Sequence, residues 1–149
     1  MAAILVAAHI VRLPHEQLMV DFLDVGQGDA IFLTMPNGEQ VLVDGGPGQT
    51  VLRELAEVMP FLDRKINLVV LTHPHADHVM GLVSVLERYE VGAILLTGAY
   101  YKNAIYEAFL KRVAKFEVPT YVAEGQVLQI GEADFEVLYP QESVAGQGF

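Results

Sequence analysis

The sequence predicts an α/β domain in which helices cover a mixed β-sheet. Three features lead to this prediction: short apolar runs between turn residues over 20–43, helical periodicity from residue 50, and nearly continuous apolar runs at 66–71 and 91–97. Strands that alternate with helices after an initial meander are typical of this architecture. With 149 residues, of which 52% are hydrophobic, the chain has the size of one domain with a core of its own.

The N-terminal part of the predicted sheet is a β-meander. Apolar runs at residues 20–25, 31–35 and 40–43 are separated by the turn sequences GQGD and PNGE. Apolar runs on both sides of such turns indicate antiparallel hairpins, and glycine supplies the positive φ angles that tight turns require. We therefore expect three consecutive antiparallel strands before the first helix.

The rest of the chain is predicted to alternate between helices and strands. Apolar residues at helical spacing indicate helices over 50–62, from about residue 78 to 86, and over 105–116. The runs at 66–71 and 91–97 lack the alternation of a half-exposed strand, so both are expected to be buried on two faces of a parallel sheet. Short strands near 120–122 and 134–139 complete the predicted fold.

The first 18 residues are assigned separately from the domain at 19–149. The apolar run at residues 1–11 is too short to span a bilayer. It is either a poorly packed leader or the end of a membrane helix whose upstream part is missing, and the composition does not decide between them.

Charge and composition exclude several classes of function. A net charge of −10 argues against a basic surface for nucleic-acid backbones, although bound divalent metals would offset this charge locally. The chain has no cysteine, which excludes disulfides, thiolate metal ligands and cysteine nucleophiles. Any metal ion must therefore be held by histidine, aspartate or glutamate.

The segment HPHADH at 73–78 is the strongest functional signal. It follows a predicted buried strand and contains four potential metal ligands, namely His73, His75, Asp77 and His78. Residues two apart in an extended segment point the same way, and Pro74 stiffens that geometry, so His73 and His75 are expected to bind one ion. Asp77 and His78 then face a second ion. The alternative is that the segment is a histidine-rich surface loop with no metal-binding role.

Imidazole and carboxylate ligands favour zinc, with manganese or iron as less favoured alternatives. Asp44 also follows a predicted strand and precedes the flexible turn GGPG. It is interpreted either as an acceptor that orients a metal-binding histidine or as a turn-capping residue. Gln27 and Asp29 lie in the GQGD turn, where they are either part of the hairpin or at the edge of the active site.

These motifs resemble those of a known family. The H-x-H-x-D-H pattern and the segment VLVDGG at 41–46 are similar to two signatures of the metallo-β-lactamase superfamily. More narrowly, FLDVGQGDAIFL at 22–33, HPHADHVMGL and GEADFEVLYP resemble the C-terminal domain of ComEC-type DNA-uptake (competence) proteins over roughly residues 19–140.

The resemblance implies a fold, a site and a reaction. The fold would be the first half of an αββα sandwich, made of a β-meander followed by βαβα units. His73 and His75 would bind the first of two zinc ions, whereas Asp77 and His78 would bind the second, with Asp77 assigned to the catalytic centre and Asp44 beside the pair. The reaction would be metal-dependent hydrolysis of phosphodiesters, acting on a DNA strand at the extracytoplasmic side of a bacterial cell membrane.

One departure from the family pattern bears on the function of this chain. The family's later ligands have no counterpart here, because all five histidines precede residue 79. We therefore expect a domain truncated at its C-terminus, a hydrolase when complete, whose uncovered sheet face promotes self-association. Two alternatives stay open: a stand-alone small-molecule hydrolase of the lactonase or thioesterase type, and a non-catalytic module that binds metal or a partner.

Overall fold

The computed structural model describes residues 17–144. Most of the leader predicted at 1–18 therefore lies outside the described residues. Among the described residues, no helix has the length and apolar character needed to cross a membrane.

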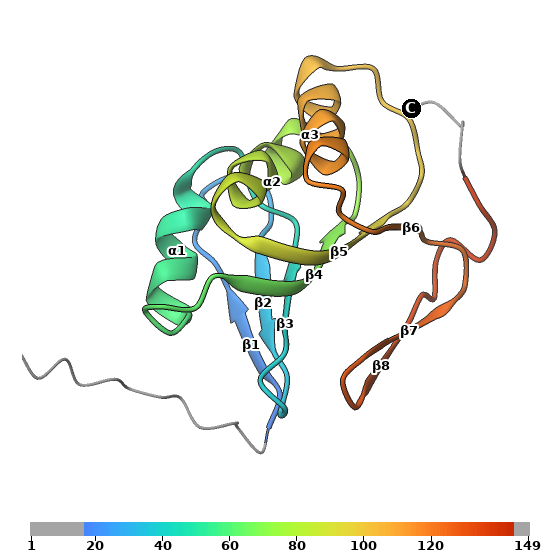
Figure 1. The fold of residues 1–149 in the computed structure, drawn as a ribbon. Coiled ribbons are helices and arrows are strands. Elements are labelled where there is room, and N and C mark those ends of the chain that lie inside the picture. Colours follow the sequence, from blue (N-terminus) through green and yellow to red (C-terminus); the bar gives the residue numbers. More distant parts are fainter. Residues whose placement is uncertain (1–16, 145–149) are drawn as a thin grey trace, which may run out of the picture.

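A six-stranded mixed sheet with three helices on one side forms most of the structure (Figure 1). The strands, in spatial order, are β1 (Met19–Phe22), β2 (Ile31–Thr34), β3 (Gln40–Val43), β4 (Lys65–Leu71), β5 (Glu90–Leu96) and β6 (Thr120–Val122). The helices are α1 (Thr50–Val58), α2 (Ala76–Arg88) and α3 (Ala104–Lys115). The predicted α/β fold class is confirmed.

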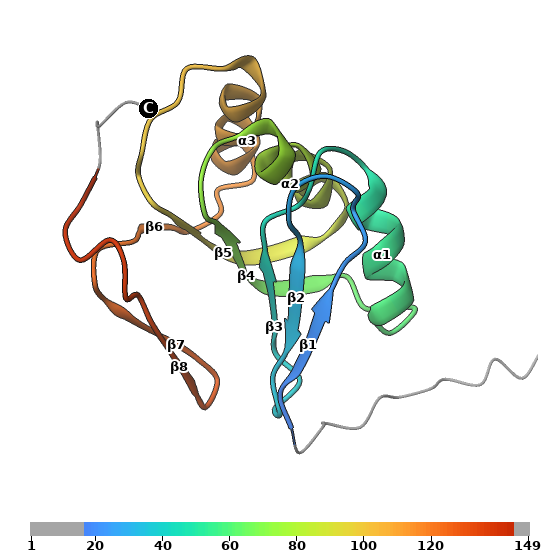
Figure 2. The same cartoon turned by 180° about the vertical axis from the view of Figure 1, so that it is seen from behind.

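The predicted β-meander is also confirmed. β1 pairs antiparallel with β2, and β2 pairs antiparallel with β3. Seen from behind in Figure 2, these three strands lie side by side. From β3 onward the pairing is parallel, through β4 and β5 to β6. Since helices connect the parallel strands, this part of the sheet follows the alternation seen in the sequence.

The end of α1 and the start of α2 differ from the prediction for reasons that the structure shows. α1 ends at Val58 and not at residue 62, because Pro60 biases Met59 toward the extended conformation that the structure shows (φ −87, ψ 152). α2 begins at Ala76, two residues earlier than predicted. The extended residue His75 precedes it as the N-cap and contributes the first acceptor of the helix, because its carbonyl oxygen accepts from the N–H groups of His78 and Val79.

The main core lies between the sheet and the three helices. Neighbouring strands contribute Phe32, Leu42, Val69 and Ile94 to one row across the sheet, and each is at most 1% exposed. From the helices, Leu55, Leu82 and Phe109 are fully buried against this face. Most of the apolar positions that indicated the helices thus supply the core.

A hairpin covers part of the opposite face of the sheet. It consists of β7 (Val127–Ile130) and β8 (Ala133–Glu136), of which only the second was predicted. Its residues Leu128 and Ile130 pack in a second core with Met35, Val41 and Leu68. The uncovered apolar face expected from the sequence is therefore smaller than predicted, because Met35 and Val41 are buried.

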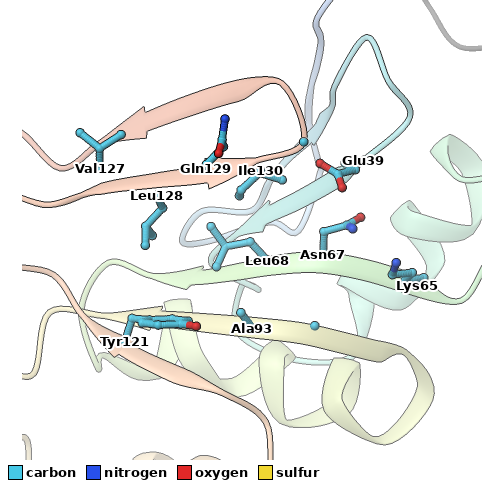
Figure 3. A pocket seen from close by; sticks show the side chains of 12 residues that line it. Glu39, Lys65, Asn67, Leu68, Ala93, Tyr121, Val127, Leu128, Gln129 and Ile130 are labelled. Carbon is cyan, nitrogen blue, oxygen red and sulfur yellow. The ribbon is translucent and has the colours of Figure 1, made fainter.

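A cavity of about 480 Å³ remains between this hairpin and the sheet. Figure 3 shows Leu128 and Ile130 above Leu68 and Ala93, with the polar side chains of Lys65, Asn67 and Glu39 toward the first residues of β4. The cavity thus lies near the amino ends of the parallel strands, which is the opposite edge from the histidine segment.

Helix α2 contacts the turn after β3 at a glycine. A Cβ atom on Gly81 would lie 1.8 Å from the carbonyl oxygen of Gly45, and the Gly81 N–H donates to the Gly46 carbonyl at 3.0 Å. The same turn is held by the Gly45 N–H, which donates to the carbonyl of His78 at 2.8 Å. This backbone contact fixes the turn that carries Asp44 against the helix that carries His78.

Replacing Gly81 by alanine is expected to destabilise the protein. The substitution favours helix by about 1 kcal/mol, but the added Cβ forces two backbone segments apart, so we expect a net loss of about 2 kcal/mol in the free energy of unfolding. Chemical denaturation measures it. Gly48→Ala is the control, because a Cβ there meets nothing within 4 Å. Equal denaturation midpoints for the two variants would mean that the close approach is not required.

Candidate metal centre

The potential ligands lie where the parallel strands end. Asp44 directly follows β3, Thr72 directly follows β4, and the segment before α3 follows β5. Parallel strands present their carboxyl ends at one edge of a sheet, where backbone turns aim several side chains at one point. The fold therefore brings together residues that are distant in the sequence.

Asp44 is the anchor of this edge. It is 2% exposed and has a positive φ of 57°, a conformation that aspartate tolerates better than most residues. Its Oδ1 accepts from the N–H of Thr72 at 2.9 Å, and its Oδ2 accepts from the Thr72 hydroxyl at 2.6 Å. Oδ2 also contacts Nδ1 of His78 at 2.8 Å. Both carboxylate oxygens thus bind Thr72, and Oδ2 also binds the histidine segment that follows it.

These contacts determine which ring nitrogens are free. A carboxylate only accepts, so Nδ1 of His78 donates to Asp44, and in the neutral ring the lone pair is then on Nε2. The single proton of the Thr72 hydroxyl goes to Asp44. The 3.0 Å contact between that hydroxyl and Nδ1 of His73 is therefore one in which Nδ1 donates. Both rings present Nε2 as the electron-pair donor, which is the atom that a metal ion needs.

The protonation state of His73 suits metal binding as well. Burial disfavours its charged form and lowers its pKa below the ordinary histidine value, and the neighbouring rings of His78 and His75 lower it further. The neutral ring is the form that binds a metal ion.

The structure brings three residues into one group of potential ligands. One ligand atom each of Asp44, His73 and His78 lies within 4.8 Å of the others. His75 lies next to this group, with its ring centroid 4.6 Å from that of His73. Oδ1 of Asp77 is 4.0 Å from Nε2 of His78. All four predicted ligands are therefore neighbours, and their division between two ions stays a prediction.

Asp44 makes the contact that the orienting role requires, since it holds Nδ1 of His78. A residue that only caps the turn would not need this contact with a histidine ring. Gln27 and Asp29, both exposed, lie in the loop between β1 and β2. That loop borders the site, because a Cβ on Gly28 would lie 2.0 Å from the carbonyl oxygen of Asp77. A direct role for Gln27 or Asp29 stays a prediction.

Sequence reasoning did not single out three residues that contact the segment. Thr72 joins Asp44 to His73, Asn103 binds the carbonyl of Pro74, and the Tyr101 ring lies 5.3 Å from that of His75. For Thr72, the position directly before the motif and after a strand is a usable signal. For Asn103, the available signal is an N-cap residue before a helix, which predicts the cap and not the second contact.

Comparison with known proteins places these residues in a family context. A family model described as the metallo-beta-lactamase superfamily matches residues 23–136. ComE operon protein 3 of Bacillus subtilis (strain 168) is 29% identical over 140 residues, a match that covers 82% of this chain and 18% of that protein. The chain thus spans less than a fifth of the length of this relative.

Solved structures agree on the fold. A motif mutant of a metallo-beta-lactamase from Cronobacter sakazakii has a TM-score of 0.53 at 15% identity, covering 79% of this chain and 52% of that one. The Rm3 metallo-beta-lactamase has a TM-score of 0.50 at 18% identity, covering 81% and 51%. The chain corresponds to about half of each structure, and the similarity at these identities concerns the fold alone.

Proposed function

The chain belongs to the metallo-beta-lactamase superfamily, and from this premise we propose that it acts as a metal-dependent hydrolase with its metal centre on residues 73–78. One observation carries the proposal: Asp44 and Thr72 fix the rings of His73 and His78 so that both present Nε2. A surface loop rich in histidine has no need for a buried carboxylate behind it. Histidines that bind a metal ion are normally oriented by a hydrogen bond from the other ring nitrogen, as both rings are here.

The donor set fits zinc. It consists of neutral imidazole nitrogens and a carboxylate, the ligands of protein zinc sites that contain no cysteine. We propose two ions, the first on His73 and His75 and the second on Asp77 and His78, with manganese or iron as alternatives. Bound metal would supply Lewis-acid activation of water and of the substrate oxygen. The protein contributes the tautomers, the fixed rings and the negative charge of Asp77.

We propose that the substrate is a phosphodiester of DNA, taken as a single strand. The proposal is supported by the similarity to ComE operon protein 3 and by the segments at 22–33, 73–82 and 131–140 that resemble ComEC-type DNA-uptake proteins. On the same grounds we place the activity at the extracytoplasmic side of a bacterial cell membrane. Local positive charge from two metals would offset the net charge of −10 where an anionic strand binds.

Metal-loaded protein is expected to cleave single-stranded DNA and bis(p-nitrophenyl) phosphate, and to lose this activity with a chelator. The full-length protein is the form to assay. A lactone and a thioester serve as competing substrates. If these are hydrolysed and phosphodiesters are not, the domain is a small-molecule hydrolase. If no substrate is turned over by protein with bound metal, the domain is a non-catalytic metal-binding module.

Asp77→Asn is expected to lower phosphodiester cleavage at least about 100-fold. An amide is a weaker metal ligand than a carboxylate, and the substitution removes the negative charge that Asp77 places beside the metal ion. The side chain is partly exposed, so the melting temperature should change little. Parallel activity assays and thermal melts separate these effects. Asp134→Asn, which changes an exposed carboxylate in β8, is the matched control. Equal losses of activity and stability in Asp77→Asn would make this residue a structural cap.

A further inference from the structure

Asn103 uses both ends of its side-chain amide. Its Oδ1 accepts from the backbone N–H of Tyr106 at 2.7 Å and so caps the first turn of α3. Its Nδ2 donates to the carbonyl oxygen of Pro74 at 3.2 Å. The residue therefore connects the start of α3 with the segment between His73 and His75, 29 positions away in the sequence.

The carbonyl of Pro74 needs a hydrogen-bond partner to keep this segment in place. Proline has no N–H, so the carbonyl is the one backbone hydrogen-bonding group that Pro74 offers. Pro74 is buried, and a buried carbonyl that loses its partner is costly. On one side, Thr72 is tied to Asp44. On the other side, the carbonyl of His75 accepts the first bonds of α2. Between these two points, Asn103 binds the carbonyl of Pro74.

The residues just before Asn103 support the same segment from the side. The Asn103 N–H donates to the carbonyl of Tyr101 at 2.9 Å. The ring of Tyr101 meets that of His75 edge-on, with a centroid distance of 5.3 Å and an interplanar angle of 68°. One short stretch after β5 thus contacts both the backbone and a ring of the histidine segment.

We propose that Asn103 is a positioning residue for the metal centre, which holds the backbone between His73 and His75 so that both rings are set before an ion binds. The inference rests on the proposed function for the identity of these rings as ligands. Asparagine suits the role because its side chain offers an acceptor and two donors at once. Aspartate at this position would keep the cap on α3 and lose the donor to Pro74. Serine would also cap α3, but its one hydroxyl lies one atom closer to the backbone than the Asn103 amide nitrogen, so it is expected to lose the contact with Pro74.

Amide hydrogen exchange on the metal-free protein tests the positioning directly. In Asn103→Asp and Asn103→Ser, we expect the N–H groups of His78 and Val79, which donate to His75, to exchange about three- to tenfold faster, the scale of one lost neutral hydrogen bond. The N–H of Tyr106 should keep its protection in Asn103→Asp, because aspartate caps as well as asparagine does. The uncharged serine variant controls for the added negative charge.

Titration with cobalt(II), followed by visible absorption, tests the link to metal. Both variants are expected to bind about three- to tenfold more weakly than the parent. If exchange at His78 and Val79 is unchanged in both variants, the inference is overturned. Faster exchange with unchanged cobalt(II) affinity also overturns it, because Asn103 would then hold the backbone without contributing to metal binding. A parent chain without cobalt(II) binding refutes the proposed metal centre, and the exchange result then still decides whether Asn103 holds the segment.

Discussion

Replacing His73, His75 and His78 together by alanine is expected to abolish zinc binding. Three of the four proposed ligands are then removed, and the remaining carboxylate of Asp77 cannot compete with water for the ion. A zinc site normally has at least three protein ligands, so the two ligands proposed for each ion are already fewer than a full set, and the variant leaves too few donors to hold zinc. We therefore expect the zinc content after exhaustive dialysis to fall to the level of the buffer.

Elemental analysis measures the result, and two variants make it interpretable. The double variant His9→Ala/His15→Ala changes the two histidines outside the motif and should retain the parent's zinc. The single variant His75→Ala changes an exposed ring, so its loss of zinc cannot be attributed to unfolding. His78, by contrast, is buried and bonded to Asp44. A triple variant that retains as much zinc as the parent would rule out the motif as the site.

The strands and helices of the fold could be predicted because burial sets their patterns. β4 and β5 are apolar almost without alternation, since one face meets the helices and the other meets the hairpin or the second core. β7 was missed for a physical reason: four residues with one central polar position, Gln129, carry little local signal. Its residue Ile130 belongs to the second core together with Met35 and Val41, which lie far away in the sequence. The helix predicted over 105–116 ends one residue earlier, and Phe116, which follows it, is 44% exposed.

The site was predictable to the extent that it is local. Residues 73–78 carry all four proposed ligands in one motif, and the position of Asp44 after a strand pointed to the same edge of the sheet. The partners were not predictable, because the bonds of Asp44 to Thr72 and His78 span 28 and 34 positions. No periodicity encodes such contacts. They follow from the parallel order of β3, β4 and β5, which is known only once the sheet is formed.

An apolar patch remains on the sheet face opposite the helices. Val20 and Phe22 on β1 are 44% and 79% exposed, and they point to the same face because they are two residues apart in a strand. Their partners in β2 are Leu33 and Ile31, which are only partly buried. Within the described residues, β1 is also an edge strand, with β2 as its one neighbour. An exposed apolar edge strand favours association with another chain.

The protein is therefore expected to self-associate through this face. Hydrophobic burial drives association, and exposed patches beyond a few hundred Å² are rare in monomers. The weight-average mass from light scattering should rise with protein concentration. Phe22→Lys should shift this rise to at least about tenfold higher concentration, because a charged side chain would lose its hydration in the interface. Phe61→Lys is the matched control, since Phe61 is 86% exposed and lies in the loop after α1. A parent that stays monomeric at high concentration, with a cooperative unfolding transition, would contradict the prediction and would mean that the hairpin already covers enough of this face.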